Sequence, residues 1–180
     1  YSAAGATCIS VLTDTPSFMG SKEDLGIARN SSPLPLLRKD FFIDPYQVFE
    51  TKYLGGDCIL IILSMLSDSQ ARELYQTAQE IELDSIFEVH NENEFERALS
   101  MNAKLIGINN RNLHTFETDI RTTVNLAPKF SDELIIISES GIYNNTQIKM
   151  LREKNVNAFL VGESIIKSDN MTKVIQDLLD

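Results

Sequence analysis

The chain has 180 residues, of which 43% are apolar, and a formal net charge of -10. This length and composition suffice for one sizeable hydrophobic core. The negative charge argues against nucleic acid as a partner, because phosphate backbones require clustered Lys and Arg side chains. It leaves room for a small anionic substrate, since a few local donors can outweigh the average field.

The apolar segments are too short to cross a membrane. The longest uninterrupted run, 58–63, falls far below the roughly 20 residues that a spanning helix needs. With no signal-peptide pattern, we predict a cytoplasmic protein without membrane contact. Cys8 and Cys58 both lie in apolar runs, which predicts two buried, reduced thiols, and no Cys-x-x-Cys pair suggests zinc or redox chemistry.

Short apolar runs alternate with amphipathic segments along the whole chain. Near-continuous apolar runs of this length are typical of parallel strands that are covered on both faces. We therefore predict seven strands, at Thr7–Leu12, Leu34–Leu37, Cys58–Leu63, Ser85–Val89, Leu105–Ile108, Leu134–Ile137 and Ala158–Val161.

The segments between these runs carry helix signals. Asp44 provides an N-cap acceptor before Pro45 and Gln47, and Gly55-Gly56 suits the end of the same helix. A second capping pattern starts at Asn91. Apolar stripes predict two further helices that pack on a sheet, and they consist of Ala71, Leu74, Tyr75, Ala78 and Ile81, and of Met171, Val174, Ile175, Leu178 and Leu179.

Strict alternation of strands and helices leaves two architectures, an open doubly wound sheet and a closed barrel. A complete (β/α)8 barrel has eight units and typically about 250 residues, so this chain is one unit short. It also starts abruptly at residues 1–5, which resemble a helix end and its cap. One domain over residues 1–180, truncated at its N-terminus, is the simplest interpretation.

Polar residues follow the predicted strands with unusual regularity. They occur at Arg38-Lys39-Asp40, at Glu88, at Asn109-Asn110-Arg111, at Ser138-Glu139-Ser140-Gly141 and at Gly162-Glu163-Ser164. In parallel α/β architectures the carboxyl ends of the strands are where ligands bind. Because burying such groups without partners costs several kcal/mol, a purely structural protein has little reason to place them there.

The last two of these segments predict a phosphate site. Glycines let backbone N–H groups approach an anion, and a helix start adds donors and a favourable dipole. Ser140-Gly141 and Gly162-Glu163-Ser164 fit this pattern, although plain turns would look similar. Neither a Walker A motif nor G-x-G-x-x-G is present, so a nucleotide ligand is not expected.

These motifs together resemble the indole-3-glycerol phosphate synthase family, over residues 2 to about 167. The matching segments are Ile9–Asp14 with Phe18 and Gly20-Ser21, Leu37–Phe41, Ile43–Gln47, Glu88–Asn91, Ile106–Leu113, Ser138–Ile142 and Phe159–Ser164. The resemblance implies an α/β fold, an incomplete TIM (β/α)8 barrel of about seven βα units that correspond to strands 2–8.

The resemblance also implies a reaction, a site and a substrate. The family closes the ring of 1-(2-carboxyphenylamino)-1-deoxyribulose 5-phosphate, with loss of CO₂ and water, to give indole-3-glycerol phosphate in tryptophan synthesis. It needs no cofactor or metal. Lys39 matches its general acid, Glu88 a carboxylate that takes or relays protons, and Asn109 an amide that holds substrate hydroxyls.

Further positions carry over as contacts to this small phosphorylated anion. Arg111 is expected to pair with an anionic group, and Glu139 to lie near the ribulose chain. The phosphate is assigned to Ser140, Gly141, Gly162 and Ser164, and the apolar wall around the aromatic ring to Phe18, Phe41, Leu60, Leu113 and Phe116.

One departure from the family pattern leaves alternatives open. The family's first strand carries Glu-x-Lys and Ser-Pro-Ser motifs, which supply a second catalytic lysine, a catalytic glutamate and a phosphate contact, and extra N-terminal helices precede it. Nothing here corresponds to these. The chain alone is then expected to be impaired, and an alternative is a catalytically incomplete phosphate-binding barrel fragment. A phosphoribosylanthranilate isomerase would use Cys and Asp, a motif that Cys8 does not fit.

Two further expectations follow. An open barrel edge exposes unpaired strands, which predicts a poorly stable monomer or self-association by swapping or dimerisation. His90 lies among Glu88, Glu92 and Glu94, which invites a metal site. Acidic residues also suit the first turn of a helix, and we predict no metal there.

Overall fold

The computed structural model describes residues 1–112, 115–127 and 133–180. They form two compact units. One comprises Thr7–Phe87 with Ser2, and the other Glu88–Asp180 with Tyr1 and Ala3–Ala6. Strand β4, at Asp84–Val89, contributes residues to both. That residues 1–180 act as a single domain stays a prediction.

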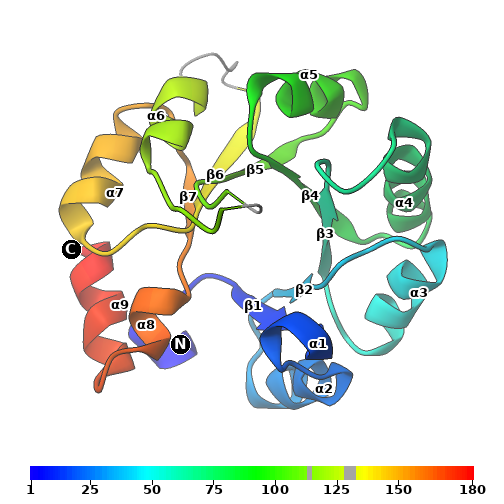
Figure 1. Cartoon of the computed structure of the whole chain (residues 1–180). Coiled ribbons are helices and arrows are strands. Elements are labelled where there is room, and N and C mark those ends of the chain that lie inside the picture. Colours follow the sequence, from blue (N-terminus) through cyan, green and yellow to red (C-terminus); the bar gives the residue numbers. More distant parts are fainter. Residues whose placement is uncertain (113–114, 128–132) are drawn as a thin grey trace. The chain divides into compact units, whose positions relative to one another are not determined.

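The unit at 7–87 consists of βα repeats. Its elements are β1 (Ile9–Leu12), α1 (Thr15–Phe18), α2 (Lys22–Ser31), β2 (Leu36–Lys39), α3 (Pro45–Tyr53), β3 (Cys58–Ile62) and α4 (Asp68–Glu80), followed by the start of β4. β1 pairs with β2 and β2 with β3, both in parallel, with Leu12 opposite Lys39. Helix α2 packs on β1 and β2, and α4 packs on β3 and α3 (Figure 1).

The unit at 88–180 continues the same alternation. Its elements are α5 (Glu92–Ser100), β5 (Leu105–Asn109), α6 (Arg121–Leu126), β6 (Ile135–Glu139), α7 (Asn145–Arg152), β7 (Ala158–Leu160), α8 (Glu163–Ile166) and α9 (Met171–Leu179). Ala3 and Ala4 of a 3-10 helix at Ser2–Ala4 also belong here. β5 pairs in parallel with β6, and β6 with β7. Helix α6 packs on β5, and α9 contacts α7 and α8 (Figure 1).

The strands follow the chain order β1-β2-β3-β4-β5-β6-β7 in one sheet. A doubly wound sheet would reverse its order at a switch point, whereas sequential order with a helix after each strand is the topology of a (β/α)8 barrel. The described residues contain seven such strands, which confirms the class of an incomplete TIM barrel. The strand interiors form the core, with Ile59, Leu60 and Ile61 of β3 and Ile106 and Ile108 of β5 at most 1% exposed.

Local signals place the helix starts as expected. Asp44 caps α3, with Pro45 as its first residue and Gln47 closing a capping box. Asn91 caps α5 through the backbone N–H of Glu94. The prediction for Cys8 is wrong: this residue is exposed, because it precedes β1 instead of lying within it, while Cys58 begins β3 and is partly buried.

Candidate active site

The carboxyl ends of β4 and β5 bring two predicted catalytic residues into contact. Glu88 of β4 is 2% exposed and Asn109, the last residue of β5, is 7% exposed. The Asn109 amide donates a hydrogen bond from Nδ2 to Glu88 Oε1 at 3.2 Å. This bond orients the carboxylate and satisfies one of its oxygens, as a buried acid requires. Glu88 and Asn109 therefore form the centre of the candidate site.

Arg111 joins this centre to the last βα unit. Its backbone N–H donates to Asn109 Oδ1 at 3.0 Å, and its guanidinium Nη2 lies 2.6 Å from Oε2 of Glu163. Glu163 also binds Lys167, and these two cations lower the pKa of its exposed carboxyl. A substrate anion that used Arg111 would compete with Glu163 for the guanidinium. Glu163 is thus a neighbour that the sequence did not connect to Arg111.

Glu139 lies beside the same centre on the next strand. It ends β6, pairs in register with Asn109 and is 1% exposed. The adjoining Asn110 is a structural residue: its side chain donates to Ser138 Oγ and to the Ser140 carbonyl, and it accepts from Thr123. These bonds fix the turn after β6, a role that the sequence motif alone did not reveal.

The predicted phosphate loops have the expected backbone. Ser140 and Gly141 both have positive φ, +66° and +73°, and a Cβ on Gly141 would come within 2.6 Å of the Thr118 side chain. Gly162 precedes the short helix α8, and Ser164 Oγ donates to the Ile142 carbonyl at 3.1 Å. The turns after β6 and β7 therefore lie against each other, although their role in phosphate binding stays a prediction.

His90 belongs to the same cluster. Its Nε2 lies 3.4 Å from Glu88 Oε1, and its Nδ1 lies 3.1 Å from Glu94 Oε2. Burial alone would lower the pKa of His90, but the hydrogen bond to Glu94 and the charges of Glu88, Glu94 and Glu139 outweigh it and raise the pKa. The signal was present in the sequence as the spacing of Glu88, His90 and Glu94.

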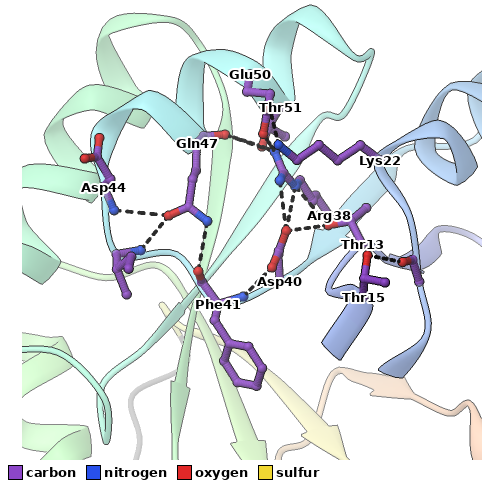
Figure 2. Close-up of polar contacts among 12 residues, drawn as sticks. Thr13, Thr15, Lys22, Arg38, Asp40, Phe41, Asp44, Gln47, Glu50 and Thr51 are labelled. Atoms are coloured by element: carbon purple, nitrogen blue, oxygen red, sulfur yellow. Dashed lines mark hydrogen bonds and ion pairs between the residues drawn. The ribbon is translucent and has the colours of Figure 1, made fainter. Parts of the chain in front are cut away.

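The unit at 7–87 holds Lys39, the predicted general acid. Lys39 is half-buried at the end of β2. The preceding Arg38 is 1% exposed and bonds to α3, so strand alternation turns Lys39 to the opposite face. Figure 2 shows Arg38 surrounded by Thr13, Asp40, Glu50 and Thr51.

The predicted apolar wall is only partly described. The rings of Phe18 and Phe41 stack, with centroids 6.1 Å apart and planes at 30°. Leu60 is buried within β3, whereas Phe116 in the other unit is 71% exposed. Leu113 lies outside the described residues. The role of these residues as an aromatic-binding wall stays a prediction.

Neither a metal site nor a membrane-spanning helix is found in the described parts of the chain. No group of three or more His, Cys, Asp and Glu side chains there has a metal-binding arrangement. No helix among them is long and apolar enough to span a bilayer.

Sequential parallel βα units with buried Glu88, Asn109 and Glu139 at their carboxyl ends define an enzyme chain of the (β/α)-barrel class. The family model described as indole-3-glycerol phosphate synthase matches residues 1–178. The chain belongs to the indole-3-glycerol phosphate synthase family.

Individual relatives agree with this assignment. An indole-3-glycerol phosphate synthase of Legionella pneumophila (strain Lens) is 45% identical over 179 residues, which cover 99% of this chain and 69% of that protein. One of Acinetobacter baumannii (strain AYE) is 48% identical over 168 residues, covering 93% of this chain and 63% of the relative. The chain thus spans about two thirds of the length of these relatives.

Proposed function

We propose that the chain catalyses the reaction of its family, the conversion of 1-(2-carboxyphenylamino)-1-deoxyribulose 5-phosphate to indole-3-glycerol phosphate. The observation that carries the proposal is the family match over residues 1–178. The contact between Glu88 and Asn109 supports it, because the family motifs predicted both residues for one site. This makes the chain a carboxy-lyase of tryptophan synthesis.

The proposed chemistry assigns one role to each ionisable group. The Lys39 ammonium donates a proton to the ribulose carbonyl oxygen, so that the ring carbon of the anthranilate attacks a better electrophile. Loss of CO₂ then restores electrons to the ring, and loss of water completes the indole. Glu88 accepts or relays protons in these steps, and Asn109, which binds Glu88, holds the substrate hydroxyls.

The remaining groups bind the substrate. Backbone N–H groups and hydroxyls of Ser140, Gly141, Gly162 and Ser164 bind the phosphate, which the positive φ values after β6 support. Arg111 pairs with an anionic group of the substrate, and Glu139 lies near the ribulose chain. We expect this enzyme in the cytoplasm, and we expect self-association through an exposed sheet edge, which light scattering of the purified protein checks.

The test is an assay of indole-3-glycerol phosphate formation with matched lysine variants. Lys39→Met is expected to lower kcat at least about 100-fold, the usual contribution of a general acid, with little change in unfolding midpoint. The control Lys52→Met removes a lysine on α3 that only reaches the Glu82 carbonyl, and it should leave kcat unchanged.

Two results would contradict the proposal. Near-normal turnover by Lys39→Met removes the role assigned to this lysine. Saturable binding of the phosphorylated substrate without any turnover by the unsubstituted protein would instead favour a non-catalytic phosphate-binding chain.

A further inference from the structure

Glu94, His90 and Glu88 form a line of alternating charge at the carboxyl end of β4. Glu94 Oε2 accepts a hydrogen bond from the His90 backbone N–H at 2.8 Å and lies 3.1 Å from its Nδ1. The other ring nitrogen, Nε2, lies 3.4 Å from Glu88 Oε1. The side chains of all three are mostly buried, at 11%, 14% and 2% exposed.

The chain builds this line from local rules. Glu88 lies in β4 and His90 follows the last residue of that strand, so the two side chains come from neighbouring positions at one strand end, where His90 Nε2 lies 3.4 Å from Glu88 Oε1. Glu94 is the third residue of α5, where a carboxylate that accepts backbone N–H bonds stabilises the helix start. Asn91 holds the other Glu94 oxygen, Oε1, at 2.7 Å. Glu94 is therefore fixed in place, and His90 is fixed by it.

The surroundings of the imidazole are acidic on three elements. Glu88 of β4, Glu94 of α5 and Glu139 of β6 all favour the charged ring. His90 in turn lowers the pKa of Glu94, although burial opposes this. Nε2 is buried and makes no hydrogen bond within the described residues, so its effect on Glu88 is electrostatic at 3.4 Å.

We infer that His90 is a positioning residue for the proposed lyase reaction: its ring, held by Glu94, lies against Glu88 Oε1 and keeps that carboxylate aimed at Asn109. This inference rests on the proposed function, because it gives Glu88 the task of accepting a proton. His90 itself transfers no proton in this scheme.

The first test measures the coupling by NMR, without reference to activity. His114→Gln leaves His90 as the only histidine, so its ring signals can be titrated alone. In this background Glu88→Gln is expected to lower the pKa of His90 by about one pH unit, and Glu94→Gln by at least as much. Glu96→Gln, on the exposed side of α5, is the matched control and should leave the titration unchanged.

The second test separates kcat from KM. His90→Gln should lower kcat about tenfold with little change in KM or in the unfolding midpoint, because the ring no longer holds the Glu88 carboxylate toward Asn109. His90→Lys, which again places a nitrogen donor near Glu88, should restore part of kcat. A merely structural residue would lower the unfolding midpoint together with kcat, and lysine would not restore the rate.

The outcomes separate this inference from the proposed function. An active His90→Gln enzyme with unchanged kcat would overturn the inference and leave the lyase assignment intact. A His90 titration that is the same with Glu88→Gln as in the His114→Gln background alone would overturn it also. Absence of lyase activity in the unsubstituted protein would contradict the proposed function, while the NMR titration would still decide the coupling.

Discussion

Replacing Arg38 by methionine tests whether the buried ion cluster under α3 stabilises the unit at 7–87. The guanidinium is 1% exposed and lies 2.8 Å from Asp40 Oδ2 and 2.9 Å from Glu50 Oε2. It also donates to Thr13 Oγ1 and to the Gln47 carbonyl (Figure 2). Methionine keeps the apolar stem of the side chain but removes all of these donors.

The expected loss in the free energy of unfolding follows from the Asp40 and Glu50 carboxylates, which remain mostly buried after the guanidinium is removed. Removing one partner of a buried ion pair typically costs about 3–5 kcal/mol, because the remaining charge is uncompensated. The Asp40 and Glu50 side chains are 11% and 13% exposed, and Glu50 keeps an ion pair with Lys22. Partial rehydration and this second partner place the expected loss near the lower limit, at about 3 kcal/mol.

Urea unfolding followed by far-UV circular dichroism measures this loss. With a slope of about 2 kcal/mol per molar urea, the midpoint should fall by about 1.5 M. Arg121→Met removes an arginine that is 79% exposed beside Asp119 and should not change the midpoint measurably. A fall below about 0.5 M for Arg38→Met would refute the reasoning and show that the cluster contributes little.

Three further predictions concern backbone, thiol and imidazole. Gly20→Ala should destabilise the protein by more than about 1 kcal/mol in the same urea titration, because the added Cβ would overlap the backbone at the end of β1. Gly26→Ala lies in open space within α2 and should stabilise the protein by about 0.5–1 kcal/mol. Burial, and secondarily the charge of a nearby acid, raises the pKa of the Cys58 thiol. A thiol reagent at pH 8 should therefore label exposed Cys8 at once and Cys58 only in urea, and equal labelling rates would contradict this. Because the folded-state pKa of His90 is raised, the stabilisation that its charged form provides is complete below about pH 6.5 and is lost as pH rises through the folded pKa. The melting temperature of the unsubstituted protein should therefore exceed that of His90→Gln by more at pH 6 than at pH 9. A difference that stays constant with pH would refute this.

Local sequence rules predicted the elements because those rules act over a few residues. Apolar runs located all seven strands, and the Asp44 and Asn91 capping patterns located the starts of α3 and α5. Boundaries moved by at most two residues, in part because polar residues such as Lys39 and Asn109 continue the strand ladder beyond the apolar run.

The family motifs suggested a set of site residues whose roles stay predictions, and the polar pattern at the strand ends grouped neighbours that the structure separates. Arg38 was placed with Lys39 among the polar residues of one strand end, yet it lies among side chains of α3. The separation of Arg38 from Lys39 follows from strand geometry, because consecutive residues of a strand point to opposite faces of the sheet. The burial of Arg38 depends, in addition, on Glu50, an acid that α3 supplies from 12 residues further along the chain.

Periodicity and the succession of short segments were enough to predict the βα alternation and the capped helix starts, because both are local properties of the chain. The spacing of Glu88, His90 and Glu94 likewise indicated nearby acids around His90. The contact of Arg111 with Glu163, 52 residues away, and the effect of the Glu139 charge on His90 came from the fold. Such contacts depend on which distant segments fold against each other, and no local pattern encodes that choice.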